Sequence, residues 1–69
     1  MKRSEFSNLK KMDKNFTDNY VGQKFLHGDT LIKQLENKQI GDDITYFIVT
    51  DITESGSILY APVTEILEK

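Results

Sequence analysis

The sequence has no cysteine, and this absence removes several kinds of chemistry at once. Without a thiol there is no disulfide, no thiolate metal ligand and no cysteine nucleophile, a composition that fits a reducing cytoplasm. Long apolar runs are also missing: the longest is Phe47-Ile48-Val49, whereas a membrane-spanning helix needs about 20 apolar residues. We therefore predict a cytoplasmic protein that does not cross a membrane.

Histidine is scarce, and recognisable catalytic motifs are missing. His27 is the single histidine, and neither His27-Gly28-Asp29 nor Asp42-Asp43 offers enough ligands for a metal site. The four glycines are scattered, so they form no phosphate-binding loop, and no serine has the context of a nucleophile. The sequence therefore predicts a protein that is not an enzyme and that binds no metal or cofactor.

The chain length suits a single small domain, residues 1–69, with a thin core. Small domains without disulfides often gain stability by oligomerisation, so a homodimer is one expectation. The charge is uneven: residues 1–14 hold five basic residues and two acids, whereas residues 15–69 hold four basic residues and nine acids. Such asymmetry can mark an interaction arm, but it also describes a solvated helix on an ordinary acidic domain.

Residues 4–16 have the pattern of an amphipathic helix, with Ser4 as a candidate N-cap. The apolar residues of this segment recur at steps of three and four and would share one helical face. They are Phe6, Leu9, Met12 and Phe16. We therefore divide the chain into an N-terminal amphipathic helix within residues 1–16 and a compact β-rich body over residues 20–68.

The next segment has two interpretations. In the first, residues 20–27 and 30–35 are strands joined by a turn at Gly28, where glycine tolerates a positive φ. In the second, residues 30–40 form a helix that Asp29 caps. We favour the strands, because a two-stranded sheet alone is marginal and needs further pairing.

Residues 44–52 are the most strand-like segment, because β-branched and aromatic residues dominate them. Gly56 suits a tight loop, so residues 57–61 should return as the partner strand. Pro62 cannot donate a ladder hydrogen bond, so pairing should end there or Pro62 should lie at a sheet edge. A short turn or helical tail is expected over residues 63–67.

This hairpin has apolar residues on both faces, whereas a hairpin with one solvated side alternates cleanly. The register that the loop implies gives the pairs Ile52–Ile58, Thr50–Tyr60 and Ile48–Pro62. The larger face, expected to form the core, consists of Ile44, Tyr46, Ile48, Ile52, Ile58 and Tyr60. The face that needs a cover consists of Phe47, Val49, Leu59 and Val63. The N-terminal helix, a second copy of the chain or a partner protein could provide that cover.

Five short strands after a helix look like a small SH3-like barrel. We therefore predict a mostly β fold, with an N-terminal helix and a five-stranded SH3-like barrel. The alternative is an α+β fold in which two helices pack on a β-hairpin. The likeness is one of fold alone, and a fold does not fix a function.

The absence of a catalytic set, the two-faced hairpin and the acidic body predict a small non-enzymatic binding or regulatory protein that docks on another protein. The predicted partner-binding residues are Phe47, Val49 and Leu59, together with the acids Asp42, Asp43, Asp51 and Glu54. A sharper version is an acidic inhibitor of a nucleic-acid enzyme, of the type that mobile elements encode. In that version the acids would meet a basic surface and select it by charge.

The alternative function is a nucleic-acid-binding small barrel that uses the basic N-terminal helix, with Lys10, Lys11 and Lys14 on one side. The acidic body opposes this alternative, because phosphate contacts dominate such binding. Arg3 is the single arginine, so bidentate reading of guanine has almost no donor. A protein is therefore the expected partner, and nucleic acid is the less favoured one.

Overall fold

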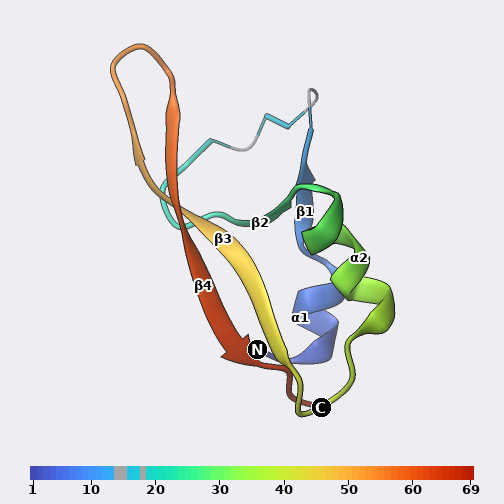
Figure 1. Cartoon of the computed structure of the whole chain (residues 1–69). Coiled ribbons are helices and arrows are strands. Elements are labelled where there is room, and N and C mark those ends of the chain that lie inside the picture. The colour runs from blue at the N-terminus through green and yellow to red at the C-terminus, as the bar shows by residue number, and fades with distance from the viewer. Residues whose placement is uncertain (14–15, 18) are drawn as a thin grey trace.

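The computed structural model covers residues 1–69 and describes residues 1–13, 16–17 and 19–69, with Leu35 described by its backbone alone. In chain order its elements are α1 (Arg3–Ser7), β1 (Lys10–Met12), β2 (Lys24–His27), α2 (Asp29–Asn37), β3 (Asp43–Ile52) and β4 (Ile58–Ile66) (Figure 1). The strands form one sheet in the order β1-β2-β3-β4, with β1 parallel to β2 and the other neighbours antiparallel. The molecule is elongated, 39 × 19 × 17 Å, because the β3–β4 hairpin extends beyond the rest of the chain.

The prediction of a mostly β fold is confirmed. The sheet over the described residues has four strands and is not closed, so the predicted five-stranded SH3-like barrel is not shown. The alternative prediction anticipated the two helices, but it missed the strands that widen the hairpin into a sheet. Neither described helix has the length and apolar character needed to cross a lipid bilayer.

The N-terminal helix is much shorter than predicted. α1 spans five residues, ends at Ser7 and buries Phe6. Lys10 then pairs with Phe25, and Met12 pairs with His27, in the parallel β1–β2 ladder. The prediction of a helix over residues 4–16 is therefore wrong for residues 8–13 and 16, because pairing with a distant strand satisfies backbone groups that a short helix leaves marginal, while residues 14 and 15 lie outside the described residues.

The favoured strand over residues 30–35 is also wrong, because this segment belongs to α2. Gly28, with a φ of +89°, turns the chain from β2 into the helix. Asp29 lies in the first turn, where the helix dipole favours an anion. Leu31 and Ile32 then pack against the buried core, so the helical alternative is the correct one, although the helix ends at Asn37 rather than at residue 40.

The hairpin is confirmed, with corrections at its far end. β3 covers the predicted strand, and Gly56, with a φ of +86°, lies in the loop that the Thr53 N–H···O=C Ser57 hydrogen bond closes. β4 continues through Pro62 to Ile66, so the predicted turn or helical tail over residues 63–67 is wrong. Pro62 is tolerated because β4 is an edge strand of the described sheet, which was one of its two expected positions.

A β-bulge changes which residues of the hairpin face each other. Ile52 pairs with Ile58 as predicted, but the register shifts between Val49 and Asp51. Thr50 is the inserted residue, and its hydroxyl donates to the Leu59 carbonyl oxygen at 3.2 Å. The observed pairs are Val49–Tyr60, Ile48–Ala61 and Phe47–Pro62, so the predicted pairs Thr50–Tyr60 and Ile48–Pro62 are wrong by one residue.

The two faces of the sheet therefore differ from the predicted ones. The covered face holds the core cluster of Phe6, Leu26, Ile44, Tyr46 and Leu67, and both helices contribute to it. Ile48 and Val63, which the sequence placed on opposite faces, are only half-buried. Tyr60, expected in this core, instead pairs with Val49 and lies beside Phe47. The N-terminal helix thus covers the Ile44 side and not the Phe47 side.

Gln34 replaces a missing strand residue beside β3. The β2 pairing with β3 ends at Phe25, so Thr45 has no partner strand on that side in the observed register. The Gln34 side-chain amide accepts a hydrogen bond from the Thr45 N–H at 3.2 Å and donates one to the Thr45 carbonyl oxygen at 3.1 Å. One side chain thus fixes α2 to the sheet through both backbone groups of a β3 residue.

Candidate functional site

The face opposite the helices carries a cluster of aromatic rings, which we call the aromatic cluster. Its members are Phe16, Phe25, His27, Phe47 and Tyr60. Phe25 and Phe47 are cross-strand partners whose ring centroids lie 5.8 Å apart in a stacked arrangement. Tyr60 meets Phe47 edge to face at 5.2 Å and Phe25 at 5.3 Å. Such geometry adds to the energy of burial, so the cluster is a second small core.

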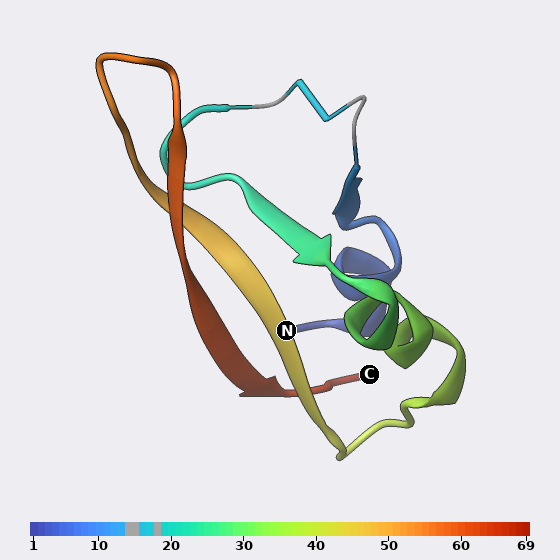
Figure 2. The ribbon, with the colours of Figure 1, turned by 45° about the horizontal axis from the view of Figure 1, so that its top comes forward.

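The chain between β1 and β2, which we call the crossover, leads from β1 to the hairpin (Figure 2), and its Phe16 ring contacts the aromatic cluster. This crossover joins β1 to β2, and Phe16 within it lies 5.4 Å from the Phe25 ring. Two hydrogen bonds fix its end to the hairpin: the Gly22 N–H donates to the Val49 carbonyl oxygen, and the Val49 N–H donates to the Gln23 carbonyl oxygen. Phe25 and Val49 are consequently buried, whereas His27 and Tyr60 remain exposed at the rim.

The hairpin beyond the bulge projects from the body as a two-stranded ribbon (Figures 1 and 2). Its loop is held by hydroxyl groups: the Ser57 N–H donates to Thr53 Oγ1 at 3.0 Å, and Thr53 Oγ1 lies 2.9 Å from Ser55 Oγ. Two-stranded ribbons are marginal on their own, so this loop network and the bulge are what keep its shape. Leu59 projects from the ribbon and is 47% exposed.

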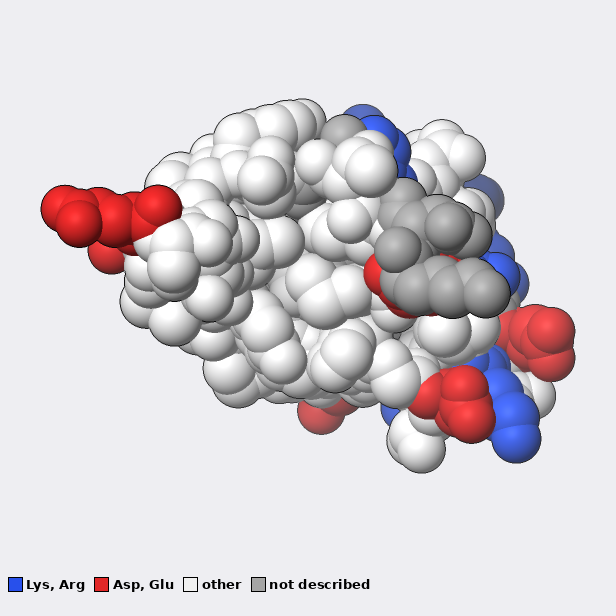
Figure 3. Space-filling view, turned by 90° about the horizontal axis from the view of Figure 1, so that it is seen from above, with Lys and Arg blue, Asp and Glu red and all other residues white. Residues whose placement is uncertain are grey.

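The described residues of the crossover and the ribbon are mostly uncharged, and we call the uncharged ones the neutral end. They are residues 16, 17, 19–23, 52, 53 and 55–60; the acids Asp51 and Glu54 lie between them in the ribbon, and Lys14 and Asp18 of the crossover lie outside the described residues. Tyr20 and Val21 are the most exposed large apolar side chains among the described residues, at 59% and 60%. Figure 3 views the molecule from this side and shows uncharged atoms over much of it, with acidic atoms at the projecting tip and at the lower edge, and acidic and basic atoms toward the other end.

The three apolar residues predicted to bind a partner do not share one surface. Phe47 is half-buried within the aromatic cluster, and Val49 is 1% exposed, so its side chain is closed to a partner. Leu59 is exposed and lies at the neutral end. Because the strand neighbours Leu59 and Tyr60 point to opposite sides of the ribbon, Leu59 also does not join the aromatic cluster.

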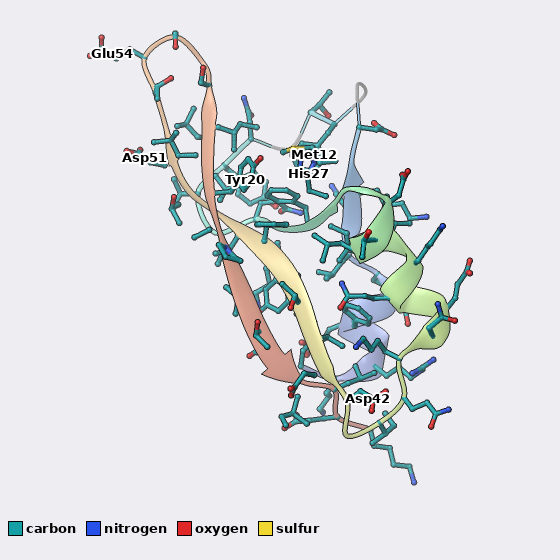
Figure 4. All side chains as sticks on the ribbon, in the orientation of Figure 1. Met12, Tyr20, His27, Asp42, Asp51 and Glu54 are labelled. Atoms are coloured by element: carbon teal, nitrogen blue, oxygen red, sulfur yellow. The ribbon has the colours of Figure 1, made fainter. Side chains whose placement is uncertain are left out.

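The four acids predicted to bind a partner lie at two distant ends of the molecule. Figure 4 places Asp51 and Glu54 at the projecting end of the hairpin and Asp42 at the opposite end, before β3. Asp43 begins β3, so it lies with Asp42. Two of these carboxylates accept local hydrogen bonds: Asp42 Oδ2 from the Gln39 N–H and Asp51 Oδ1 from the Ile52 N–H, at 2.9 and 2.8 Å. The acids therefore form no common surface.

Tyr46, on the covered face, has a raised pKa. Burial raises the pKa of Tyr46 to about 12, and the hydrogen bond that its hydroxyl donates to Glu65 Oε2 at 2.7 Å acts in the same direction. The charges of Glu65 and Glu5 add to this effect. A neutral phenol bound to a carboxylate stabilises the fold, and it offers no acid or base for chemistry near neutral pH.

One hollow opens outside the neutral end, between α2 and Thr45, with a volume of about 480 Å³. Lys33 and Lys38 lie on its lining. Its amide groups are already bonded: Gln34 to the Thr45 backbone and Asn37 to the Lys33 carbonyl oxygen. Within the described residues, no three His, Asp or Glu side chains gather where they could hold a metal ion.

Sequence reasoning missed several residues of this region. No contact partner was predicted for His27, yet its ring lies 5.7 Å from Tyr60 and 6.2 Å from Phe47. Figure 4 shows His27 close to Met12, its partner in the β1–β2 ladder, and Tyr20 beside the hairpin. The alternation of Phe25 and His27 was a usable signal, because period two places both on one face of a strand.

Comparison with protein-family models, curated proteins and solved structures finds no match to this chain. The neutral end and the aromatic cluster are therefore the features of the chain that bear on its function.

Proposed function

We propose that this chain is a small non-enzymatic binding protein that acts by docking its neutral end on a protein surface. The observation that carries the proposal is the strong exposure of three apolar side chains on the crossover and the ribbon, Tyr20, Val21 and Leu59. Exposed apolar patches of this kind mark interaction sites, and aromatic residues with few charges are typical of interface centres. The buried part of the aromatic cluster supports this surface from below.

The open edge of β4 is a poor docking site, which favours contact through the neutral end. Both backbone groups of Val49 form hydrogen bonds with the crossover, on the side of β3 away from β4. In an antiparallel pair, the N–H and C=O of its partner Tyr60 then point away from β3, to the open side of β4. Every second residue after Tyr60 does the same, namely Pro62, Thr64 and Ile66. Pro62 has no N–H to offer a new strand, and the Ile66 carbonyl oxygen already accepts a hydrogen bond from the amino group of Met1. An added strand would find an interrupted ladder.

The acidic-inhibitor version of the proposal has weaker support. It requires the acids to meet one basic surface, whereas Asp42 and Asp43 lie at one end of the hairpin and Asp51 and Glu54 at the other. The nucleic-acid alternative also has weaker support, because it required a basic helix and Lys10 and Lys11 lie on the strand β1. Lys14, the third lysine of that surface, lies outside the described residues. We therefore retain protein docking alone.

A photo-crosslinking amino acid at Tyr20 or Leu59 tests the proposal in cells that produce the protein. We expect crosslinked protein bands from both positions, because they lie at the neutral end. The matched control is Ile40, which is 49% exposed, close to the 47% of Leu59, but lies in the turn before β3. Equal crosslinking from all three positions, or none from the neutral end, would contradict the proposal.

A further inference from the structure

The hollow between α2 and Thr45 opens where the β2–β3 ladder has ended. The last ladder pair is Phe25 with Phe47, and beside Thr45 the side chain of Gln34 takes the place of a strand. A helix cannot approach a strand edge as closely as another strand can, and the space that remains has a volume of about 480 Å³. Sites for small molecules have volumes of about 300–1,000 Å³, so the hollow has the size of a ligand site.

One wall of the hollow is fixed before any ligand arrives. Gln34 accepts a hydrogen bond from the Thr45 N–H and donates to the carbonyl oxygens of Thr45 and Leu31, at 3.1 and 3.3 Å. These bonds hold α2 against β3, so the shape of the hollow does not depend on an occupant. A preformed site loses little binding energy to ordering when a ligand enters.

The charges on the lining of the hollow have one sign. Lys33 and Lys38 belong to the lining, whereas the two acids of α2, Asp29 and Glu36, do not. No other acid lies among the described lining residues. Within the described part of the chain neither lysine amine is paired with a carboxylate. Both amines are therefore available to an anion.

The surroundings of Lys38 include one further cation and one carboxylate. The Arg3 guanidinium donates to the Lys38 carbonyl oxygen at 2.8 Å, so α1 brings a third positive charge to the end of α2. The Asp42 carboxylate lies in the following turn and accepts a hydrogen bond from the Gln39 N–H. Leu31, which is half-buried, adds apolar surface to the lining, and the methylene stems of the lysines extend it.

We propose that this hollow binds a small organic anion, with the anionic group at Lys33 and Lys38 and a short apolar part against Leu31. A lysine amine acts as a point charge and does not require a planar group, so carboxylate and phosphate share the required chemistry. The hollow has no lining residue in the neutral end. The inference thus adds a ligand site to the proposed docking function and stands or falls separately from it.

A titration of isotope-labelled protein with hexanoate, followed by the amide shifts in NMR spectra, tests the site. We expect saturable shifts at Asn37 and Thr45 and none at Ser57 in the hairpin loop. Hexyl phosphate, in a second titration, identifies the preferred anionic group. Hexanol and hexylamine have the same chain without negative charge, and they should bind at least about fivefold more weakly, because the charge-assisted contacts are lost.

Variants of the two lysines connect the shifts to the proposed contacts. Lys33→Gln and Lys38→Gln should each weaken hexanoate binding at least about threefold, and Lys33→Arg should preserve it, because the charge remains. Lys24→Gln is the matched control and should change nothing, because the Lys24 amine lies over the Tyr46 ring and outside the lining. Thermal melts verify that each variant is folded, and a methionine replaces any glutamine that fails this check.

Four results overturn the inference: no saturable shift with either anion, equal affinity for hexanol, unchanged affinity in both glutamine variants, or an equal loss in Lys24→Gln. Hexanoate binding should also weaken as salt is added, because the lysines are open to solvent. Affinity that does not respond to salt would show that apolar contact alone holds the probe, which also contradicts an anion site. Crosslinking from Tyr20 and Leu59 is independent of all these results.

Discussion

The face that carries Ile44 and Tyr46 is sealed by two helices, whereas the face that carries Phe25 and Phe47 is covered by an extended crossover. Both faces bury side chains completely, yet they do so by different means. The helices contribute Phe6, Leu31 and Ile32 to the covered face, and the crossover contributes Phe16. A helix brings several apolar residues and satisfies its own backbone, whereas an extended segment covers less and depends on a few hydrogen bonds. The thinly covered face is the one that retains exposed aromatic groups.

The largest expected effect comes from removing the main cover of the first face. Phe6→Ala should lower the free energy of unfolding by about 4 kcal/mol, because a fully buried ring is lost from a helix with little other attachment. Urea denaturation measures the change. Phe6→Leu is the control and should cost less than about 1.5 kcal/mol, because it conserves most of the volume. Equal costs for both substitutions would show that the ring does not fill this core.

A smaller effect is expected where α2 is fixed to the sheet. Gln34→Ala removes both hydrogen bonds to Thr45 and should cost about 2 kcal/mol, because two backbone groups lose their partner. Thermal melts and amide exchange at Thr45 measure the stability and the local opening. Gln39→Ala, at an exposed side chain, should change stability by less than about 0.5 kcal/mol. Unchanged exchange at Thr45 in the Gln34 variant would contradict this role.

The cover of the aromatic face should matter less than that of the helical face. Phe16→Ala removes a half-buried ring and its contact with Phe25, and we expect a cost of about 1 kcal/mol. The expected local consequence is faster amide exchange at Gly22 and Val49, whose hydrogen bonds fix the crossover. A cost as large as that of Phe6→Ala would show that the two covers are equivalent and would remove the contrast between the faces.

An effect at neutral pH no larger than that of Phe16→Ala, and a distinct one at high pH, is expected at Tyr46. Its pKa in the folded chain, about 12, lies above the ordinary value of 10.0, so the fold favours the neutral phenol. The resulting stabilisation is fully present below pH 10 and is lost as the pH rises from 10 through 12. Tyr46→Phe should cost about 1 kcal/mol at pH 7, since the hydrogen bond to Glu65 is lost. Its stability should also fall less than that of the unmodified chain across that pH range, as urea denaturation at each pH can measure.

Local composition was sufficient to locate the hairpin. Ile44 to Ile52 are dense in β-branched and aromatic residues, and Gly56 supplies the positive φ of the loop, so neither depends on distant contacts. The predicted faces of the hairpin were wrong because Thr50 forms a bulge in β3. One extra residue in β3 changes which β4 side chains share a face with the part of β3 before the bulge. Thr50 has no local property that distinguishes it from a paired strand residue.

The helix predicted for the N-terminal segment was wrong for a different reason. Phe6 and Leu9 do lie against the same core, as their spacing indicated, but the chain reaches it by one helical turn followed by a strand. The pairing of Lys10 with Phe25 decides between helix and strand, and that partner is distant in sequence. The candidate surface was only partly predictable, because Tyr20 and Val21 lie on a crossover whose ends are set by the same parallel pairing.

Pro62 has a consequence for the kind of assembly that this protein can form. Sheet edges with a complete ladder can add strand after strand without limit, which is how fibrils grow. The edge of β4 lacks an N–H in the middle of its outward row, and the amino group of Met1 occupies the carbonyl oxygen of Ile66 at its end. The β4 edge therefore offers no continuous row of backbone groups on which further copies of the chain could add strand by strand.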